Sequence, residues 1–350
     1  MIGFRLAGHR LAPRAAAGEM VAVAGQVGGV QAQVMSAAEW SLGVRVDGIG
    51  RADVARALWE DRTLVKTWAM RGTLHLLPAA DLPLVMAACR SRPASWWRAW
   101  ERHLGIGAGD FERLVFAIGD ALDGRQLTRR ELIEQMAPRL AGSPGLKGAM
   151  ESGWGGVLKP AARAGILCFG PSRGQEVTFV RADQWLGGWR EIDELEAAVE
   201  LLRRYLAVNA PATREDFGRW LGTTPVVRAA WAALLPELVR VEGGHALADY
   251  EPLPAPHDCV RLLPNFDTLL LSHARREHLV AKENHALVYR LAGWVSAVVL
   301  CDGAIAGTWR LDRGTVSVDE FRPLTTRERR GVAREVERLG RFVGANLKTG

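Results

Sequence analysis

The sequence predicts an α+β fold in which a unit of three helices and a short β-hairpin occurs three times, ahead of C-terminal β structure and a final helix. Two observations lead to this prediction. Residue pairs with capping-box spacing, which mark helix N-termini, recur along the chain. Each group of helices is followed by strand-like runs that flank a turn. The alternative is an α+β domain in which the capping signals recur by coincidence.

The middle copy of the unit is the most regular. Residues 111–122 have an amphipathic helical pattern, and Thr128 and Glu131 have capping-box spacing at the start of a second helix. A third helix is expected over residues 149–164. Two strand-like runs within residues 165–180 flank a turn that contains Gly, Pro and Ser.

A second copy lies downstream. A helix over residues 195–208 precedes another capping signal, in which Thr213 stands three residues before Asp216. A further helix is expected to begin near Pro225, since proline is acceptable in the first helical turn. A hairpin follows over residues 238–248, around a Gly-Gly turn.

The N-terminal copy is looser. We expect helices over residues 33–46 and 52–67 and a strand over residues 71–77. Three helices with a two-stranded wing form the winged-helix plan, a helix-turn-helix variant in which the third helix usually faces DNA. The expected winged-helix units cover residues 1–108, 109–190 and 191–256, and the C-terminal segment covers residues 257–350.

The C-terminal segment has a different pattern. A strand is expected over residues 260–264, and residues 295–301 and 304–310 are expected to pair across the turn Asp302-Gly303. Residues 315–321 can add a third strand. A final helix is expected from Thr325, where Glu328 completes a capping box, to about residue 343. It has an apolar stripe and an arginine stripe nearly opposite, which indicates either a solvated face or phosphate contact.

Composition indicates a globular protein with a preference for anionic partners. The 350 residues carry a net charge of +6, and nearly all the basic residues are arginine. Arginine binds phosphate in a bidentate manner and stacks on bases, so this balance favours nucleic acid, although a GC-rich genome also favours arginine codons. No apolar run is long enough to span a bilayer, and we expect a cytoplasmic, nucleoid-associated protein.

Common enzyme motifs are missing from the sequence. We find no HExxH, no P-loop and no GxGxxG, so metalloprotease, nucleotide-hydrolase and Rossmann interpretations lose their usual support. The four cysteines are far apart, which predicts reduced core thiols rather than disulfides or zinc. We therefore expect no metal and no cofactor.

Five strings, in the order given, resemble one family. They are Val30-Gln31-Ala32-Gln33, Met70-Arg71-Gly72-Thr73-Leu74-His75, Arg203-Arg204-Tyr205-Leu206, Arg261-Leu262-Leu263-Pro264-Asn265-Phe266-Asp267 and Gly307-Thr308-Trp309-Arg310. Together they resemble the winged-helix DNA glycosylases typified by AlkZ and YcaQ, over nearly the whole chain. The resemblance implies three tandem winged helices in a C-shape that presents a basic surface, closed by C-terminal β structure.

The resemblance also implies the catalytic residues. The family has an active motif Gln-x-Gln in the AlkZ branch and Gln-x-Asp in the YcaQ branch, and Gln31 and Gln33 match the former. That branch is associated with self-resistance to DNA-alkylating natural products, including removal of interstrand crosslinks. The expected activity is base excision of N7-alkylguanine and N3-alkyladenine by a monofunctional glycosylase.

The chemistry of glutamine is compatible with this activity. N-glycosidic hydrolysis passes through an oxocarbenium-like sugar that water attacks. An alkylated purine is already cationic, so it leaves without a strong acid. The amides of Gln31 and Gln33 can accept from a water and donate to it, which positions the water without basicity. A lyase step needs an amine, and no lysine stands near the motif in sequence, so no lyase activity is expected.

Other residues are candidates for contact with double-stranded, alkylation-damaged DNA: Arg71, His75, Trp309, Arg310, Arg313, Arg330 and Arg334. The hairpin that turns at Asp302-Gly303 is a candidate probe of the groove, or a hairpin buried against the third unit. The roles of Glu39 and Asp267 stay open. We expect a monomer that does not bind membranes. The main alternative function is a winged-helix transcription regulator without catalysis, and a second is a YcaQ-like enzyme with broad lesion tolerance.

Overall fold

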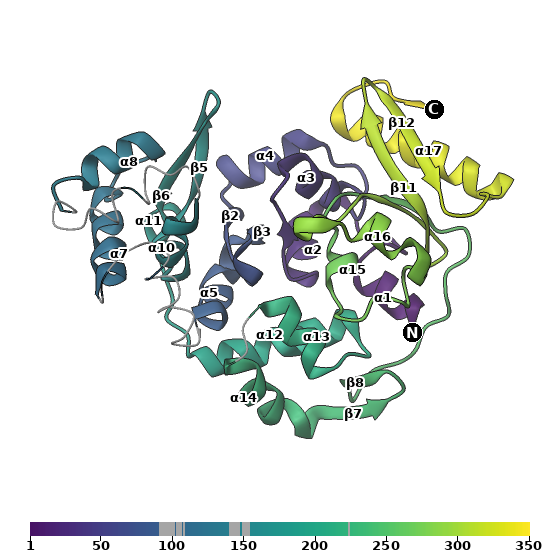
Figure 1. Cartoon of the computed structure of the whole chain (residues 1–350), viewed down its shortest axis with the longest axis horizontal. Coiled ribbons are helices and arrows are strands. Elements are labelled where there is room, and N and C mark those ends of the chain that lie inside the picture. Colours follow the sequence, from purple (N-terminus) through teal and green to yellow (C-terminus); the bar gives the residue numbers. More distant parts are fainter. Residues whose placement is uncertain (91–101, 103–106, 108, 140–147, 149–154, 223–224) are drawn as a thin grey trace.

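The computed structural model describes residues 1–90, 102, 107, 109–139, 148, 155–222 and 225–350. In Figure 1 the middle unit lies at the left, the third unit along the bottom, and the C-terminal sheet with the last helix at the upper right. N-terminal elements lie between them. The described strands form sheets in the orders β1-β3-β2, β4-β6-β5, β7-β8 and β13-β12-β11-β10-β9.

The N-terminal unit contains the largest departures from the predictions. Its helices are α1 (Ile2–Gly8), α2 (Met20–Gln26), α3 (Met35–Gly43), α4 (Arg51–Trp59) and α5 (Leu82–Arg90), and its strands are β1 (Val30–Gln31), β2 (Leu64–Trp68) and β3 (Leu74–Pro78). The single helix predicted over residues 52–67 is wrong in its second half. That half is β2, because Leu64 and Val65 are buried and the strand pairs with β3.

The middle unit largely follows its predicted order. It comprises α7 (Asp110–Ala121), β4 (Leu127–Thr128), α8 (Arg129–Met136), α10 (Lys159–Arg163), β5 (Leu167–Arg173), β6 (Glu176–Arg181) and α11 (Ala182–Trp185). The capping box of Thr128 and Glu131 is confirmed. The expected helix over residues 149–164 begins outside the described residues. Its described part is a 3₁₀ turn, Gly155–Leu158, followed by α10.

The third unit matches its prediction element by element. It has α12 (Glu194–Asn209), α13 (Arg214–Leu221), α14 (Pro225–Leu234), β7 (Leu238–Val241) and β8 (Gly244–Leu247). Thr213 accepts a hydrogen bond from the Asp216 amide, so this capping box is also confirmed. The hairpin turns at Gly243 and Gly244, whose φ angles of 89° and 148° favour glycine.

The C-terminal segment forms the five-stranded sheet. Its elements are β9 (Val260–Leu263), α15 (Thr268–Leu271), α16 (His285–Val288), β10 (Val298–Cys301), β11 (Ala304–Asp312), β12 (Thr315–Glu320), α17 (Thr326–Val343) and β13 (Lys348–Thr349). The predicted hairpin, third strand and final helix are confirmed, as is the capping box of Thr325 and Glu328. The fold is therefore α+β. The winged-helix interpretation and the boundaries of the individual units stay predictions.

Three apolar cores hold these segments together. One joins the N-terminal helices to the C-terminal sheet and α17. A second joins β2, β3 and α5 to the third unit, and a third fills the middle unit and includes Trp68 of β2. The N-terminal unit thus contributes to all three cores and links the other segments. The four cysteines are buried and free. Within the described residues, no helix is long and apolar enough to cross a membrane.

Candidate nucleic-acid active site

The glutamine pair lies where an edge strand leads into α3. β1 pairs antiparallel with β3, which places Gln31 opposite His75. The Ala32 amide then donates to the Leu74 carbonyl at 2.6 Å, and the chain bends at Gln33 and Val34 before α3 begins. The two glutamines therefore stand on either side of Ala32, at the end of the edge strand.

Gln31 is held from the interior. Its side chain is only 7% exposed, and its Oε1 accepts a hydrogen bond from Arg71 Nη2 at 3.1 Å. Arg71 also donates through Nη2 to His75 Nε2 at 3.2 Å and through Nη1 to the Trp220 carbonyl of α13 at 2.5 Å. One guanidinium therefore connects the glutamine, the β3 histidine and the third unit.

The hydrogen bonds of His75 determine its protonation. Its Nδ1 lies 3.0 Å from the Thr73 carbonyl, which can only accept, so Nδ1 carries the proton and Nε2 accepts from Arg71. Burial, and next the charge of Arg71, lower the pKa of His75 to about 3. Burial also lowers the pKa of Arg71 to about 10. At neutral pH the histidine is neutral and the arginine is charged, so His75 orients Arg71 rather than supplying a proton.

Gln33 is held differently. Its side chain is exposed, and its Oε1 accepts from the backbone amide of Leu74 at 2.9 Å. Both amide oxygens are thus fixed by donors, while within the described part of the chain neither NH2 group donates a hydrogen bond. Each oxygen keeps a second lone pair. Two fixed amides with free donors and spare lone pairs can orient a water or a sugar oxygen.

A hollow adjoins the pair, and we call it the tryptophan pocket. Its volume is about 500 Å³, and its walls include Val34 and Ser36 on one side and Trp294, Trp309 and Arg310 on the other. The Trp309 Nε1 donates to the Leu263 carbonyl at 2.8 Å, and Arg310 pairs with Asp319 at 2.6 Å. The fold therefore brings two of the predicted DNA-binding residues, Trp309 and Arg310, beside the segment that follows Gln33.

The remaining predicted contacts lie apart from this site. Arg313 is exposed at the turn between β11 and β12. Arg330 and Arg334 are exposed on α17, where Arg334 lies 3.3 Å from Asp258. His75 lies within the site, but its side chain is only 1% exposed. Contact of these residues with DNA stays a prediction.

The hairpin proposed as a groove probe needs correction. Gly303 is buried, and a Cβ built on it would lie 2.6 Å from the Ile2 side chain of α1. Asp302 accepts from the Cys259 amide at 2.7 Å. The Asp302-Gly303 turn is therefore packed into the molecule, as in the buried-hairpin alternative, although against α1 rather than the third unit.

The structure also assigns the two open carboxylates. Asp267 is fully buried and pairs with Arg45 through both oxygens, at 2.7 and 2.8 Å, so it ties the loop after β9 to α3. Glu39 lies 3.1 Å from Arg51, and burial raises its pKa. Neither carboxylate makes a hydrogen bond to the glutamine pair.

Sequence reasoning missed a second basic surface, which we call the arginine groove. It is a hollow of about 1500 Å³ along α13, α14 and the β7–β8 hairpin. Five exposed arginines line it: Arg214, Arg219, Arg228, Arg240 and Arg275. Among the described residues, none of the five forms an ion pair or a side-chain hydrogen bond. Three acidic residues also line the hollow: Asp216, which accepts from Thr213 and from the Ala274 amide, and Glu215 and Glu242, so basic side chains outnumber acidic ones there.

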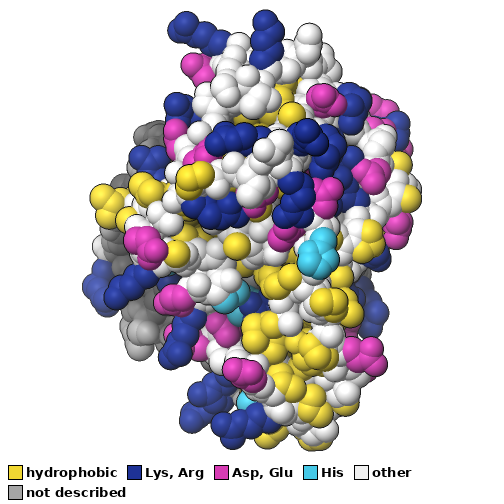
Figure 2. All heavy atoms as spheres, turned by 90° about the vertical axis from the view of Figure 1, so that its right-hand side faces the viewer, with side chains coloured by type: hydrophobic (Ala, Val, Ile, Leu, Met, Phe, Trp, Pro, Cys, Tyr) yellow, Lys and Arg dark blue, Asp and Glu magenta, His cyan; other side chains and the backbone are white. Residues whose placement is uncertain are grey.

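The groove begins next to the catalytic candidates. Arg219 precedes Trp220, whose carbonyl binds Arg71. Figure 2, which shows the side of the molecule at the right of Figure 1, has acidic side chains among the basic ones. The sequence does not reveal the groove, because whether its arginines are paired depends on where the carboxylates lie in the folded chain.

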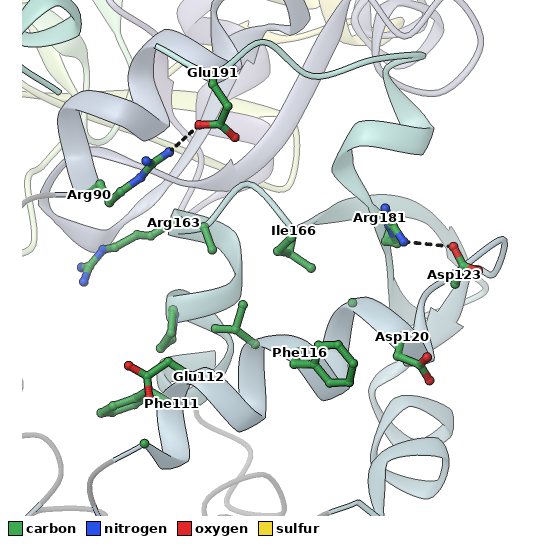
Figure 3. Close-up of a pocket in the computed structure, with 15 residues that line it drawn as sticks. Arg90, Phe111, Glu112, Phe116, Asp120, Asp123, Arg163, Ile166, Arg181 and Glu191 are labelled. Atoms are coloured by element: carbon green, nitrogen blue, oxygen red, sulfur yellow. Dashed lines mark hydrogen bonds and ion pairs between the residues drawn. The ribbon is translucent and has the colours of Figure 1, made fainter. Parts of the chain in front are cut away.

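The other large hollow, of about 960 Å³, lies in the middle unit (Figure 3). It contains none of the predicted site residues. Phe116 is 72% exposed there, and the charged side chains include the pairs Arg90–Glu191 at 3.4 Å and Arg181–Asp123 at 3.0 Å. Glu112 adds negative charge, which does not suit phosphate, and Asp120 forms an ion pair with Arg139. Across the described residues, no cluster of His, Cys, Asp and Glu is suited to a metal ion.

Comparison with known proteins identifies the family of the chain. The family model described as "DNA glycosylase AlkZ-like" matches residues 24–342. An interstrand DNA cross-link repair glycosylase from Streptomyces sahachiroi is 35% identical over 339 residues, which cover 93% of this chain and 91% of that protein. The solved structure of the Streptomyces sahachiroi DNA glycosylase AlkZ has a TM-score of 0.89 at 32% identity, covering 100% of this chain and 97% of that one. The chain therefore belongs to the AlkZ-like family of DNA glycosylases and is an enzyme of that class.

Proposed function

We propose that this DNA glycosylase hydrolyses the N-glycosidic bond of cationic alkylated purines, N7-alkylguanine and N3-alkyladenine, in double-stranded DNA. The observation that carries the proposal is the pair Gln31 and Gln33, each with its amide oxygen fixed and its NH2 group free of described partners. Within the described residues, no carboxylate makes a hydrogen bond to the pair, which suits a leaving group that needs no acid.

The proposed reaction separates bond breaking from water activation. The bond between C1′ and the purine nitrogen breaks, and its electron pair neutralises the cationic base, which leaves as a neutral alkylpurine. The sugar becomes an oxocarbenium-like cation. A water held by Gln31 and Gln33 adds to C1′ and releases its proton to solvent, leaving an abasic site. The amides contribute positioning of the water rather than basicity.

We further propose that the enzyme releases the base without cleaving the strand. A lyase step needs an amine that attacks C1′. The structure places one lysine near the site that could supply such an amine. Lys159 Nζ would lie 3.8 Å from a Cβ built on Gly72, the residue after Arg71. Burial lowers the pKa of Lys159. Borohydride trapping should give no covalent complex with damaged DNA, and a trapped complex lost in Lys159→Ala would contradict this part of the proposal.

The arginine groove supports a path for the duplex. Its five arginines have no carboxylate partners in the described part of the chain, so they can neutralise phosphates by bidentate contacts. The groove adjoins Arg71 and hence the glutamine pair. We propose that DNA beside the lesion lies along it, with the predicted contacts of Arg310 and Arg313 on the other side of the pair.

The relative's name suggests the wider role. Because the Streptomyces sahachiroi protein is described as an interstrand DNA cross-link repair glycosylase, we propose that crosslinked purines are also substrates here. Self-resistance to an alkylating natural product, or base excision repair, is the proposed context for a monomeric, nucleoid-associated enzyme.

One assay tests the core of this proposal. A duplex with a single N7-methylguanine is incubated with the enzyme, and abasic sites are then cleaved with alkali. Release of methylguanine, with no release of uracil or 8-oxoguanine from matched duplexes, is expected. Binding without release of any base would instead support the regulator alternative, and efficient uracil release would require a catalytic acid.

A further inference from the structure

We propose that the tryptophan pocket binds the planar aromatic part of a bulky adduct while Gln31 and Gln33 act at the sugar of the same nucleotide. This inference rests on the proposed glycosylase function and names a substrate class for it: alkylpurines that carry an aromatic substituent. The pocket follows the catalytic pair directly, because Val34 lines it and Gln33 precedes Val34. A substituent on a base held at the pair therefore has a hollow beside it, which a methyl group leaves empty.

The walls suit a flat aromatic group. The Trp294 side chain is 41% exposed, and its ring forms a T-shaped contact with Phe266, with centroids 5.0 Å apart and planes at 72°. A tryptophan held by such a contact keeps exposed ring surface for stacking. A volume of about 500 Å³ is within the range of roughly 300–1,000 Å³ that small-molecule pockets occupy.

The backbone holds this ring in place. The Arg290 amide donates to the Trp294 carbonyl at 2.8 Å, which closes a tight turn over residues 290–294. Within it Ala292 has a φ of 57°, and Phe266 on the facing loop has a φ of 59°. Positive φ in residues other than glycine costs free energy and concentrates at binding sites, where the surroundings enforce it.

Two polar side chains of the tryptophan pocket, Asn265 and Arg290, are available to bind a ligand. Asn265 Nδ2 donates to the Val295 carbonyl at 3.1 Å, and within the described residues its Oδ1 accepts no hydrogen bond. The exposed Arg290 side chain forms no ion pair with a described residue. The lining also includes Arg51, Thr308 and Asp319, so polar groups stand among the aromatic side chains of the pocket. Arg290 can donate to carbonyl or hydroxyl oxygens of the adduct and stack on its ring.

The test compares two lesions in one duplex sequence. One is N7-methylguanine, and the other is an N7-guanine adduct that carries a naphthyl group on a short linker. Single-turnover release rates are measured for wild type, Trp294→Ala and Trp294→Phe. The ratio of naphthyl to methyl release should fall about tenfold in Trp294→Ala, the scale of a lost stacking contact, and largely recover in Trp294→Phe.

A second variant fills the pocket instead of removing its wall. Ser36 is exposed at the rim, so Ser36→Trp should fold and should lower the same ratio by obstructing the adduct. Trp189→Ala, in the middle unit, is the control and should leave the ratio unchanged. An unchanged ratio in both Trp294→Ala and Ser36→Trp, with methylguanine still released, would overturn the pocket assignment alone. Release of neither base by wild type would overturn the proposed function, and the pocket assignment with it.

Discussion

Arginines are concentrated on two surfaces of this enzyme, and the surfaces differ in how many of these arginines are paired with carboxylates. On α17, Arg327, Arg334 and Arg338 pair with Asp302, Asp258 and Asp47. In the arginine groove, Arg219, Arg228 and their three neighbours have no carboxylate partner among the described residues. The stripe that is obvious on a helical wheel is largely neutralised, whereas the groove combines charges from separate elements. Charge pattern in sequence therefore locates arginines but does not tell which can bind phosphate.

The largest expected effect tests this contrast directly. Replacing Arg214, Arg219 and Arg228 together by Ala should weaken binding to undamaged duplex about a hundredfold near 0.1 M salt. It should also reduce the slope of log Kd against log salt by roughly 3, one unit per lost phosphate contact. Fluorescence anisotropy over a salt series measures both.

The matched control removes equal charge from α17. Arg327→Ala, Arg329→Ala and Arg334→Ala combined should change affinity only a few-fold, because each of these exposed arginines is paired with a carboxylate. Equal losses in the two triple variants would show that paired arginines of α17 also bind phosphate, as predicted for Arg334.

A smaller effect is expected at a third kind of arginine, the internal Arg71. Arg71→Ala releases Gln31 Oε1, so single-turnover base release should fall roughly tenfold or more through lost positioning. Affinity for undamaged DNA should stay within about twofold. Arg71→Lys should not restore the rate, since an ammonium does not match the guanidinium geometry that reaches Gln31, His75 and Trp220 together. A loss confined to affinity would instead indicate that Arg71 binds phosphate.

The chemical step should depend little on pH. His75 has a pKa of about 3 and Arg71 a pKa of about 10, so neither changes charge between about pH 6 and 9. Single-turnover release of N7-methylguanine should therefore be nearly constant over that range. A bell-shaped profile would show that a group with a pKa in this range takes part.

The folding stability of the enzyme should fall at acidic pH more strongly than the rate of the chemical step does. Burial lowers the pKa of His9 to about 4 and of His75 and His273 to about 3, below the unfolded value of about 6.5. The unfolded chain then binds more protons than the folded chain at intermediate pH, so stability present above about pH 6.5 is lost as the pH falls toward 3. The Tm should be several degrees lower at pH 5 than at pH 7.5, and a higher Tm at pH 5 would contradict it.

Local signals in the sequence were good guides to the fold. The capping boxes at Thr128, Thr213 and Thr325 each fix a helix start within a few residues, and the Asp302-Gly303 turn lies where its hairpin pattern placed it. Such features depend on neighbours in the chain. β2 could not be found this way, because its strand conformation depends on pairing with β3 and on burial between units.

The candidate site likewise depends partly on local sequence and partly on contacts between distant segments. Gln31 and Gln33 came from the family resemblance, but what holds Gln31 depends on the pairing of β1 with β3 and on a contact with α13. Asp267 was ambiguous in sequence because its partner, Arg45, is more than two hundred residues away in the chain. Surface turns and buried turns also look alike in sequence, so the sequence alone does not distinguish a groove probe from a packed hairpin at Asp302-Gly303.

Base release by variants of Gln31 and Gln33 tests whether this pair is catalytic. Gln31→Ala, Gln33→Ala and the double variant should each bind a duplex containing N7-methylguanine with nearly wild-type affinity. Their single-turnover release of the base should be slower by about a hundredfold or more, because each lacks one fixed group at the proposed water. Circular dichroism and Tm confirm folding. Full release activity in a folded double variant would show that the glutamine pair is not catalytic.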